Sequence, residues 1–192
     1  MFIYTDLLRA ALCCTASQED TRKILRGVHI TPTHIQATNG IAAVSMSHGS
    51  KTEIEGVFIL HGDIPASAEG TVFQKIGSQW IAAHLDYYER PVGHNELELV
   101  EGKFPDLGKL LPTEEESCSE FPIFAAELLA LPYRMFGKEF TSMPVNFKLF
   151  GPEKPCQVLF NLAVNTFYGD PVLVIMPMKS TVFELHRKAI EG

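Results

Sequence analysis

The sequence predicts an α+β fold in which helices pack on antiparallel sheets. After Gly27 the pattern takes a period of two, because residues 28–32 and 35–38 each alternate apolar with polar side chains. The Asn39-Gly40 pair that follows supplies a tight turn with positive φ. Such a turn joins antiparallel neighbours, so this stretch predicts a hairpin and a third strand at residues 41–46.

Two other stretches have the helical period. Residues 5–16 follow Thr5 or Asp6 as N-cap, and residues 121–131 run up to Pro132, which ends or kinks a helix. The apolar side chains at helical spacing are Leu7, Leu8, Ala11 and Leu12 in the first stretch and Ala125, Leu128, Leu129 and Leu131 in the second. Both stretches therefore predict helices, and the first is amphipathic.

The remaining short apolar runs predict strands separated by turns. They are residues 56–63, 71–76, 78–83, 86–90, 96–100, 145–150, 157–164 and 171–176. Residues 64–69 are too short for more than about one turn of helix, whereas residues 182–190 predict a terminal helix. A helix followed by three strands thus occurs twice, which is a repeat of architecture and not of sequence.

An acidic segment divides the chain. Residues 103–106 break the strand pattern, and residues 113–117 form a polar surface linker with three consecutive glutamates. We therefore expect two domains, at residues 1–112 and 119–180, followed by a helical C-terminal tail at residues 181–192.

The composition is that of a globular protein. A chain of 192 residues with 46% hydrophobic and 20% charged residues can bury a sizeable core. It has no apolar run of about 18 residues and no basic-then-apolar leader, so we expect a cytoplasmic protein without a membrane partner. The net charge of −7 disfavours bulk attraction to nucleic acid and leaves open a local basic surface.

Enzymatic signals are weak. The 4 cysteines lack metal-ligand spacing and are expected to be reduced thiols, and the 7 histidines are scattered, so neither a metal nor a cofactor is expected. Gly62-Asp63 and residues 103–106 lack the spacing of a phosphate loop or of paired catalytic acids. A small-molecule-binding or enzymatic α+β domain stays open as an alternative.

Several residues occur in the order typical of one family. They are Asp20-Thr21-Arg22, Leu25, Gly27 and the Ala37-Thr38-Asn39-Gly40 turn, then residues 101–106 (EGKFPD) with Leu111-Pro112, and finally residues 174–179 (VIMPMK). With them the chain resembles the bacterial replicative sliding clamp, the beta subunit of DNA polymerase III. Residues 1–112 resemble the middle domain of the clamp, and residues 121–179 resemble a shortened last domain.

The chain also departs from this family. The first domain is missing, the second helix of the middle domain has shrunk to residues 64–69, and the last domain has one predicted helix where two are usual. In the family, two copies of a three-domain chain close a ring around DNA. The resemblance therefore implies either a homo-oligomer with more than two copies of the chain or a protein that does not encircle DNA.

The resemblance implies a non-enzymatic protein of DNA replication or repair. The clamp holds duplex DNA through lysines and arginines that face phosphates, a contact that is independent of sequence and sensitive to salt. The candidates here are Arg9, Arg22, Lys23, Arg26, Arg134 and Lys138. The alternative is that these are solvated charges on helix faces.

The second implied activity is capture of a short peptide from replication or repair proteins in an apolar cleft. Its walls would be Leu25, Thr38, Gly40, Ile41, Ala42, Ala43, Pro105, Lys109, Leu110, Val174, Met176, Pro177, Met178 and Lys179. Methionine adapts to irregular apolar ligands, which suits this task. One departure is the apolar Ile41-Ala42-Ala43, where the family usually has His-Arg-Leu, and the alternative is that Met176 and Met178 fill the core.

A third interpretation accepts the resemblance to the clamp family and assigns the protein an opposite role. The protein would then be a decoy or regulator of phage or mobile-element origin that occupies clamp-binding peptides. The tail, which carries Phe183 and Leu185, can reach the cleft of its own chain or of a neighbour.

Overall fold

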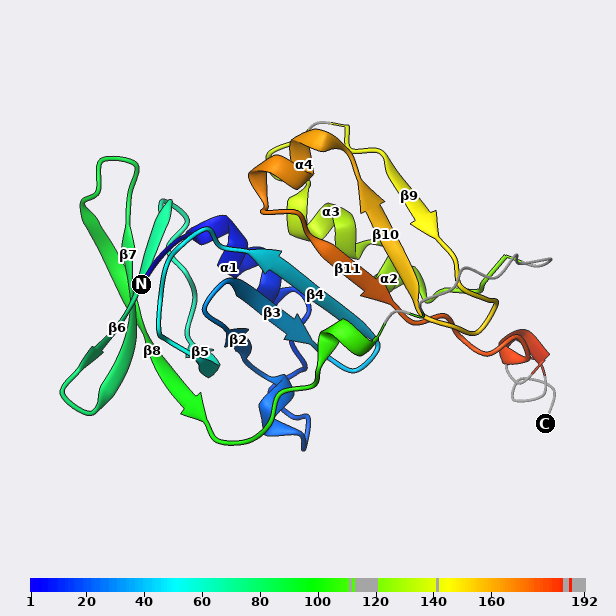
Figure 1. Ribbon diagram of the computed structural model, residues 1–192, viewed down its shortest axis with the longest axis horizontal. Coiled ribbons are helices and arrows are strands. Elements are labelled where there is room, and N and C mark those ends of the chain that lie inside the picture. Colours follow the sequence, from blue (N-terminus) through cyan, green and yellow to red (C-terminus); the bar gives the residue numbers. More distant parts are fainter. Residues whose placement is uncertain (111, 113–120, 141, 185–186, 188–192) are drawn as a thin grey trace.

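The computed structural model describes residues 1–110, 112, 121–140, 142–184 and 187 (Figure 1). Its α-helices are α1 (Thr5–Leu12), α2 (Ala126–Leu129), α3 (Leu131–Phe136) and α4 (Leu162–Phe167), and its 3-10 helices are η1 (Lys23–Leu25) and η2 (Leu107–Lys109). The strands are β1 (Phe2–Tyr4), β2 (Val28–Ile30), β3 (His34–Thr38), β4 (Ala42–Ser47), β5 (Gly56–His61), β6 (Gly70–Ile76), β7 (Gln79–Leu85), β8 (Pro91–Val100), β9 (Val145–Lys148), β10 (Cys156–Phe160) and β11 (Val172–Ile175).

The strands form one 11-stranded sheet in the order β1-β6-β7-β8-β5-β2-β3-β4-β11-β10-β9. Every pair is antiparallel, which confirms the predicted sheets at residues 27–46 and 145–176. The sheet continues from one half of the chain to the other because β4 pairs with β11. The division into domains at residues 1–112 and 119–180 stays a prediction, and the acidic linker lies outside the described residues.

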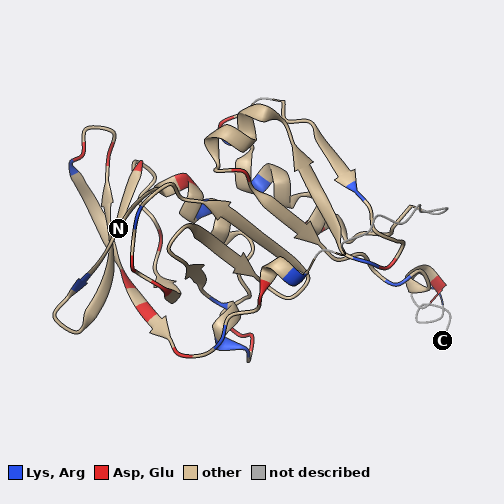
Figure 2. Cartoon of the chain, in the orientation of Figure 1, with Lys and Arg blue, Asp and Glu red and all other residues tan. Residues whose placement is uncertain are grey.

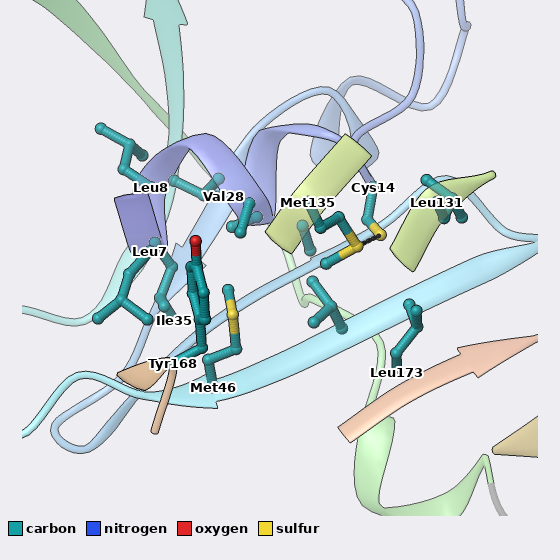
Figure 3. Close-up of a cluster of buried hydrophobic side chains, with 14 of the residues drawn as sticks. Leu7, Leu8, Cys14, Val28, Ile35, Met46, Leu131, Met135, Tyr168 and Leu173 are labelled. Carbon is teal, nitrogen blue, oxygen red and sulfur yellow. Dashed lines mark hydrogen bonds between the residues drawn. The ribbon is translucent and has the colours of Figure 1, made fainter. Parts of the chain in front are cut away.

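The core lies on the face of the sheet that α1 and α3 cover (Figure 3). Leu7 and Leu8 of α1 and Met135 of α3 are buried with Met46 and Leu173 of the sheet. Cys14 lies between the helices, and its Sγ is 3.8 Å from the Sδ of Met135. Burial raises the pKa of the Cys14 thiol to about 12, so this side chain packs as a neutral thiol.

The predicted helices are shorter than expected. The first ends at Leu12 instead of residue 16, because Cys13 and Cys14 close its last turn and the chain then bends toward η1. The second prediction, a helix at residues 121–131, is wrong in its bounds. Helix α2 begins only at Ala126, and Pro132 lies in the first turn of a further helix, α3. Proline is tolerated there because the first N–H groups of a helix have no intrahelical partner.

One predicted strand is wrong, and another is confirmed only in its first half. Residues 86–90 form the loop of the β7-β8 hairpin, where the Asp86 carboxylate accepts from the backbone N–H groups of Tyr88 and Arg90. The strand predicted at residues 157–164 ends at Phe160 and gives way to α4, because Asn161 caps that helix by accepting from the N–H of Val164 at 3.0 Å. The last third of the chain therefore has more helix than the sequence predicted.

Other elements fall outside the predictions or outside the described residues. Strand β1, at the edge of the sheet beside β6, was not predicted. Residues 64–69 contain only a turn, as predicted. Of the predicted terminal helix, Val182, Phe183 and Glu184 are helical, and most of the rest lies outside the described residues. In the part of the chain that the structure describes, no helix is long and apolar enough to cross a membrane.

Candidate functional site

The outer face of the sheet, opposite the core, carries a short cross-strand row of side chains. Thr38 of β3 pairs with Ala43 of β4, and Ala43 pairs with Val174 of β11. Side chains alternate along a strand, so Ala37, Val44 and Leu173 point into the core while this row points away from it. The row forms the floor of a cavity.

The turn at one end of this floor is held by side-chain hydrogen bonds. The Thr38 hydroxyl donates to the Ala42 carbonyl oxygen at 2.7 Å, and the Asn39 carboxamide oxygen accepts from the N–H groups of Ile41 and Ala42 at 3.0 and 2.8 Å. Gly40 has a φ of +94°, a region that favours glycine. These contacts leave Ile41 exposed at the rim, with 47% of its surface accessible.

The walls come from segments far apart in the sequence. Leu25 is supplied by η1, and Pro105, Leu107 and Leu110 come from the loop around η2. The Asp106 carboxylate caps η2 by accepting from the N–H of Gly108 at 3.1 Å, which stabilises the start of this short helix. Pro155 and Met176 complete an apolar cavity of about 190 Å³.

Arg22 also lines this cavity. Its guanidinium makes a bidentate ion pair with the Asp20 carboxylate, with Nε–Oδ1 at 3.0 Å and Nη2–Oδ2 at 2.7 Å, and it donates to the Asn39 carbonyl oxygen at 3.2 Å. The hydrogen bonds from Arg22 lower the pKa of the Asp20 carboxyl to about 2. The pair therefore stays charged throughout the ordinary pH range, with the guanidinium held beside the turn.

Most of the predicted cleft residues surround this cavity. Those that line it are Leu25, Thr38, Gly40, Ile41, Ala42, Ala43, Pro105, Leu110, Val174 and Met176. Lys109, Pro177, Met178 and Lys179 do not line it: Lys109 is exposed and paired with Asp106 at 3.1 Å, and the backbone of Met178 bonds to Ile123. The role of the whole predicted set in ligand binding stays a prediction.

Sequence reasoning missed Leu107 and Pro155 and assigned Arg22 only to DNA. Leu107 follows Pro105-Asp106 directly and could have been found from that proximity. Pro155 lies in a turn before β10, and no pattern in the sequence connects it with the other walls. Met176 is half-buried and lines the cavity, and neither it nor Met178 belongs to the buried core cluster.

Comparison with solved structures identifies the fold. The chain matches the beta chain of DNA polymerase III from Streptococcus pneumoniae with a TM-score of 0.57 and 14% identity, and the match covers 94% of this chain. It matches the DNA polymerase sliding clamp of Bacillus subtilis with a TM-score of 0.59 and 12% identity, and the match covers 94% of this chain. The chain has the fold of bacterial sliding clamps.

The match to the clamp fold covers only part of the clamp. The chain spans 64% of the Streptococcus protein and 64% of the Bacillus protein. For DNA polymerase III subunit beta of Borrelia burgdorferi, in complex with a natural product, the TM-score is 0.62 at 10% identity, with 94% of this chain and 64% of that one covered. No protein-family model matches the sequence, and no curated protein sequence matches it.

The predicted DNA-binding cations of this clamp-like chain contact protein acceptors. Arg9 donates to Asp6 at 2.9 Å and to the carbonyl oxygens of Pro65 and Ala68 at 2.8 and 3.0 Å, which ties α1 to the turn at residues 64–69. The other contacts are Arg22 with Asp20, Lys23 with Glu98, Arg26 with the Asp20 carbonyl oxygen, Arg134 with the Glu127 carbonyl oxygen, and Lys138 with Glu139.

These cations do not come together as one basic surface. Arg22, Lys23 and Arg26 lie around η1, whereas Arg9 and Arg134 lie on α1 and α3. In Figure 2, acidic positions are interspersed with basic positions along the chain. Within the described residues, no group of three or more His, Cys, Asp or Glu side chains could hold a metal ion.

Proposed function

We propose that this protein is a non-enzymatic, sliding-clamp-like component of DNA replication or repair that binds a short peptide of a partner protein. The observation that carries the proposal is one cavity that gathers Leu25, Pro105 and Met176 from widely separated segments. The partners would be replication or repair proteins with clamp-binding peptides, and no cofactor is needed for this role.

The dimensions and chemistry of the cavity support a peptide ligand. Small-molecule sites usually enclose roughly 300–1,000 Å³, so a cavity of about 190 Å³ suits one or two side chains better than a whole cofactor. Met176 can adjust its rotamers to an irregular apolar anchor. The small side chain of Ala43 leaves room above the floor, where a larger residue would fill it.

A second candidate is a decoy or regulator that binds such peptides without encircling DNA. One observation favours it over a DNA-encircling clamp. The predicted DNA-binding cations already contact protein acceptors in a chain of net charge −7. A ring assembled from copies of this chain would be an oligomer, so the oligomeric state in solution separates the two roles.

Peptide titration tests the proposal. Fluorescence anisotropy of a labelled short peptide with adjacent leucine and phenylalanine anchors should show saturable binding to the wild-type protein. Met176→Asp places an unpaired carboxylate against the apolar anchor, at a cost of about 2–3 kcal/mol, so the affinity should fall about a hundredfold.

The matched control is Ile76→Asp, which adds the same charge at an exposed apolar side chain at the far end of β6. Its affinity for the peptide should equal that of the wild type. Absence of saturable binding by a wild-type protein with an intact circular dichroism spectrum would rule out the proposed function.

A further inference from the structure

A second cavity, of about 260 Å³, adjoins the first on the same outer face of the sheet. The two cavities share Ala43, Leu107, Leu110 and Val174 as walls. The lining of the second is completed by His34, Gln36, Ser45, Gly108 and Val172. Together they form one groove that runs beneath the η2 loop.

Strand register explains why the groove changes character along its length. Gln36 pairs with Ser45, and Ser45 pairs with Val172, which makes a second cross-strand row. This row lies two residues along each strand from the row of Thr38, Ala43 and Val174, or about 7 Å away on the same face. The groove therefore passes from an apolar half to a half with polar side chains.

The hydrogen bonds of the polar half leave some of its side-chain donors without a protein acceptor. Gln36 Oε1 accepts from His29 Nδ1 at 3.0 Å, and Gln36 Nε2 donates to Ser45 Oγ at 3.1 Å. Because the Ser45 oxygen already accepts a bond, its hydroxyl proton remains to be donated. His34 Nδ1 and the Thr33 hydroxyl are 2.7 Å apart, and when the hydroxyl is the donor the imidazole carries its proton on Nε2. His34 Nε2 has no partner among the described residues.

These groups favour a ligand group that accepts hydrogen bonds and donates none. The Gln36 and Ser45 oxygens are engaged, so an amide ligand would bring N–H groups into a cavity with few acceptors for them. A carboxylate accepts at both oxygens, and hydrogen bonds to an ionised acceptor are stronger than neutral ones. The nearby Asp106 carboxylate does not oppose this, because Lys109 pairs with it.

We propose that the bound peptide places an apolar side chain in the first cavity and an aspartate or glutamate in the second. In an extended peptide, residues two positions apart project from the same side with a spacing of about 7 Å, which matches the two rows. The acidic residue is therefore two positions from the apolar anchor. This inference rests on the proposed function and adds the acidic residue as a second determinant of the partner.

The test compares two labelled peptides that differ only by glutamate or glutamine at that position. The wild-type protein should bind the glutamate peptide about tenfold more tightly in anisotropy titrations, as expected for a hydrogen-bonded ionised group. Ser45→Ala and His34→Ala should each reduce this ratio toward one. Ser78→Ala, at an exposed turn between β6 and β7, is the matched control and should keep the ratio.

The outcomes separate the two proposals. Two results would overturn this inference and leave the proposed function unaffected. The first is equal affinity of the wild type for the two peptides. The second is an unchanged affinity ratio in the protein that carries both Ser45→Ala and His34→Ala. Met176→Ala removes apolar contacts without adding charge, so it should weaken both peptides by the same factor and keep their ratio. If neither peptide binds, the proposed function and this inference both fail.

Discussion

The hydroxyl of Thr38 donates a 2.7 Å hydrogen bond to the carbonyl oxygen of Ala42 across the turn that closes the cleft. The same hydroxyl accepts from the N–H of Gly40 at 3.1 Å. One buried side chain thus bridges the two ends of the turn, since only 5% of the surface of Thr38 is exposed. The shape of the apolar half of the groove depends on this bridge.

Replacing Thr38 with valine keeps the side-chain volume and removes both hydrogen bonds. We expect the free energy of unfolding to fall by about 1–2 kcal/mol, because the N–H of Gly40 loses its acceptor. Urea unfolding measures this change. Thr166→Val, at an exposed position of α4, is the control and should change the free energy by no more than about 0.5 kcal/mol. Equal stability of the two variants would contradict the role of the bridge.

A buried polar network connects α1 with strands β6, β7 and β8, far from the groove along the sheet. His84 Nε2 and Asn95 Oδ1 are 2.6 Å apart, His84 Nδ1 and the Thr71 hydroxyl are 3.0 Å apart, and the Thr71 and Thr5 hydroxyls are 2.8 Å apart. Asn95 Nδ2 donates to the His61 carbonyl oxygen, so Oδ1 faces the imidazole and Nε2 is the donor. Desolvation by burial lowers the pKa of His84 from its ordinary 6.5.

This shift predicts a loss of stability in acid. Above about pH 6.5 the imidazole is neutral in both states, and its contribution is complete. As the pH falls below that value, the unfolded chain takes up a proton that the folded protein does not, so the free energy of unfolding decreases until the lower folded pKa is passed. Urea unfolding of His84→Gln should show a shallower decrease over this range than the wild type.

DNA binding is expected to be weak. The predicted cations already contact protein acceptors, so few are left to bind phosphates. Any binding of linear duplex DNA through these cations would be to phosphates, so it should show no sequence preference and should decrease steeply as salt rises. A filter-binding titration over a range of salt concentrations measures this. Sequence-specific, salt-tolerant binding would reject the clamp mechanism, and no binding at all would favour the decoy role.

The tail begins close to the cleft. The N–H and hydroxyl of Ser180 donate to Glu153 Oε1 at 2.9 and 2.8 Å, and Pro155, two residues after Glu153, lines the cavity. Phe183 is nonetheless 70% exposed and does not line the cleft. Truncation after Lys179 should therefore change the affinity for the apolar peptide by less than about twofold in anisotropy titrations. A tenfold gain would show that the tail competes for the cleft.

Much of the fold and several walls of the cleft were predictable because their signals are local. The alternation at residues 28–38 and the Asn39-Gly40 turn specify strands and a turn through neighbouring residues alone. The resemblance of residues 174–179 to the clamp predicts Val174 and Met176 as cleft residues, and both line the cavity. Asn161 carried a capping signal for α4, but the apolar run on either side of it favoured a strand.

By itself, the sequence determined the antiparallel sheets, the helical stretches and which segments could form a cleft. Only the tertiary structure decided how the groove continues. The pairing of β4 with β11 joins residues more than a hundred positions apart, and its register aligns Ser45 with Val172 beside Ala43 and Val174. Register depends on the packing of the whole core face, since a slip of one residue would turn these side chains inward. For the same reason, the pairing of each cation with its acceptor could not be read from charge along the chain.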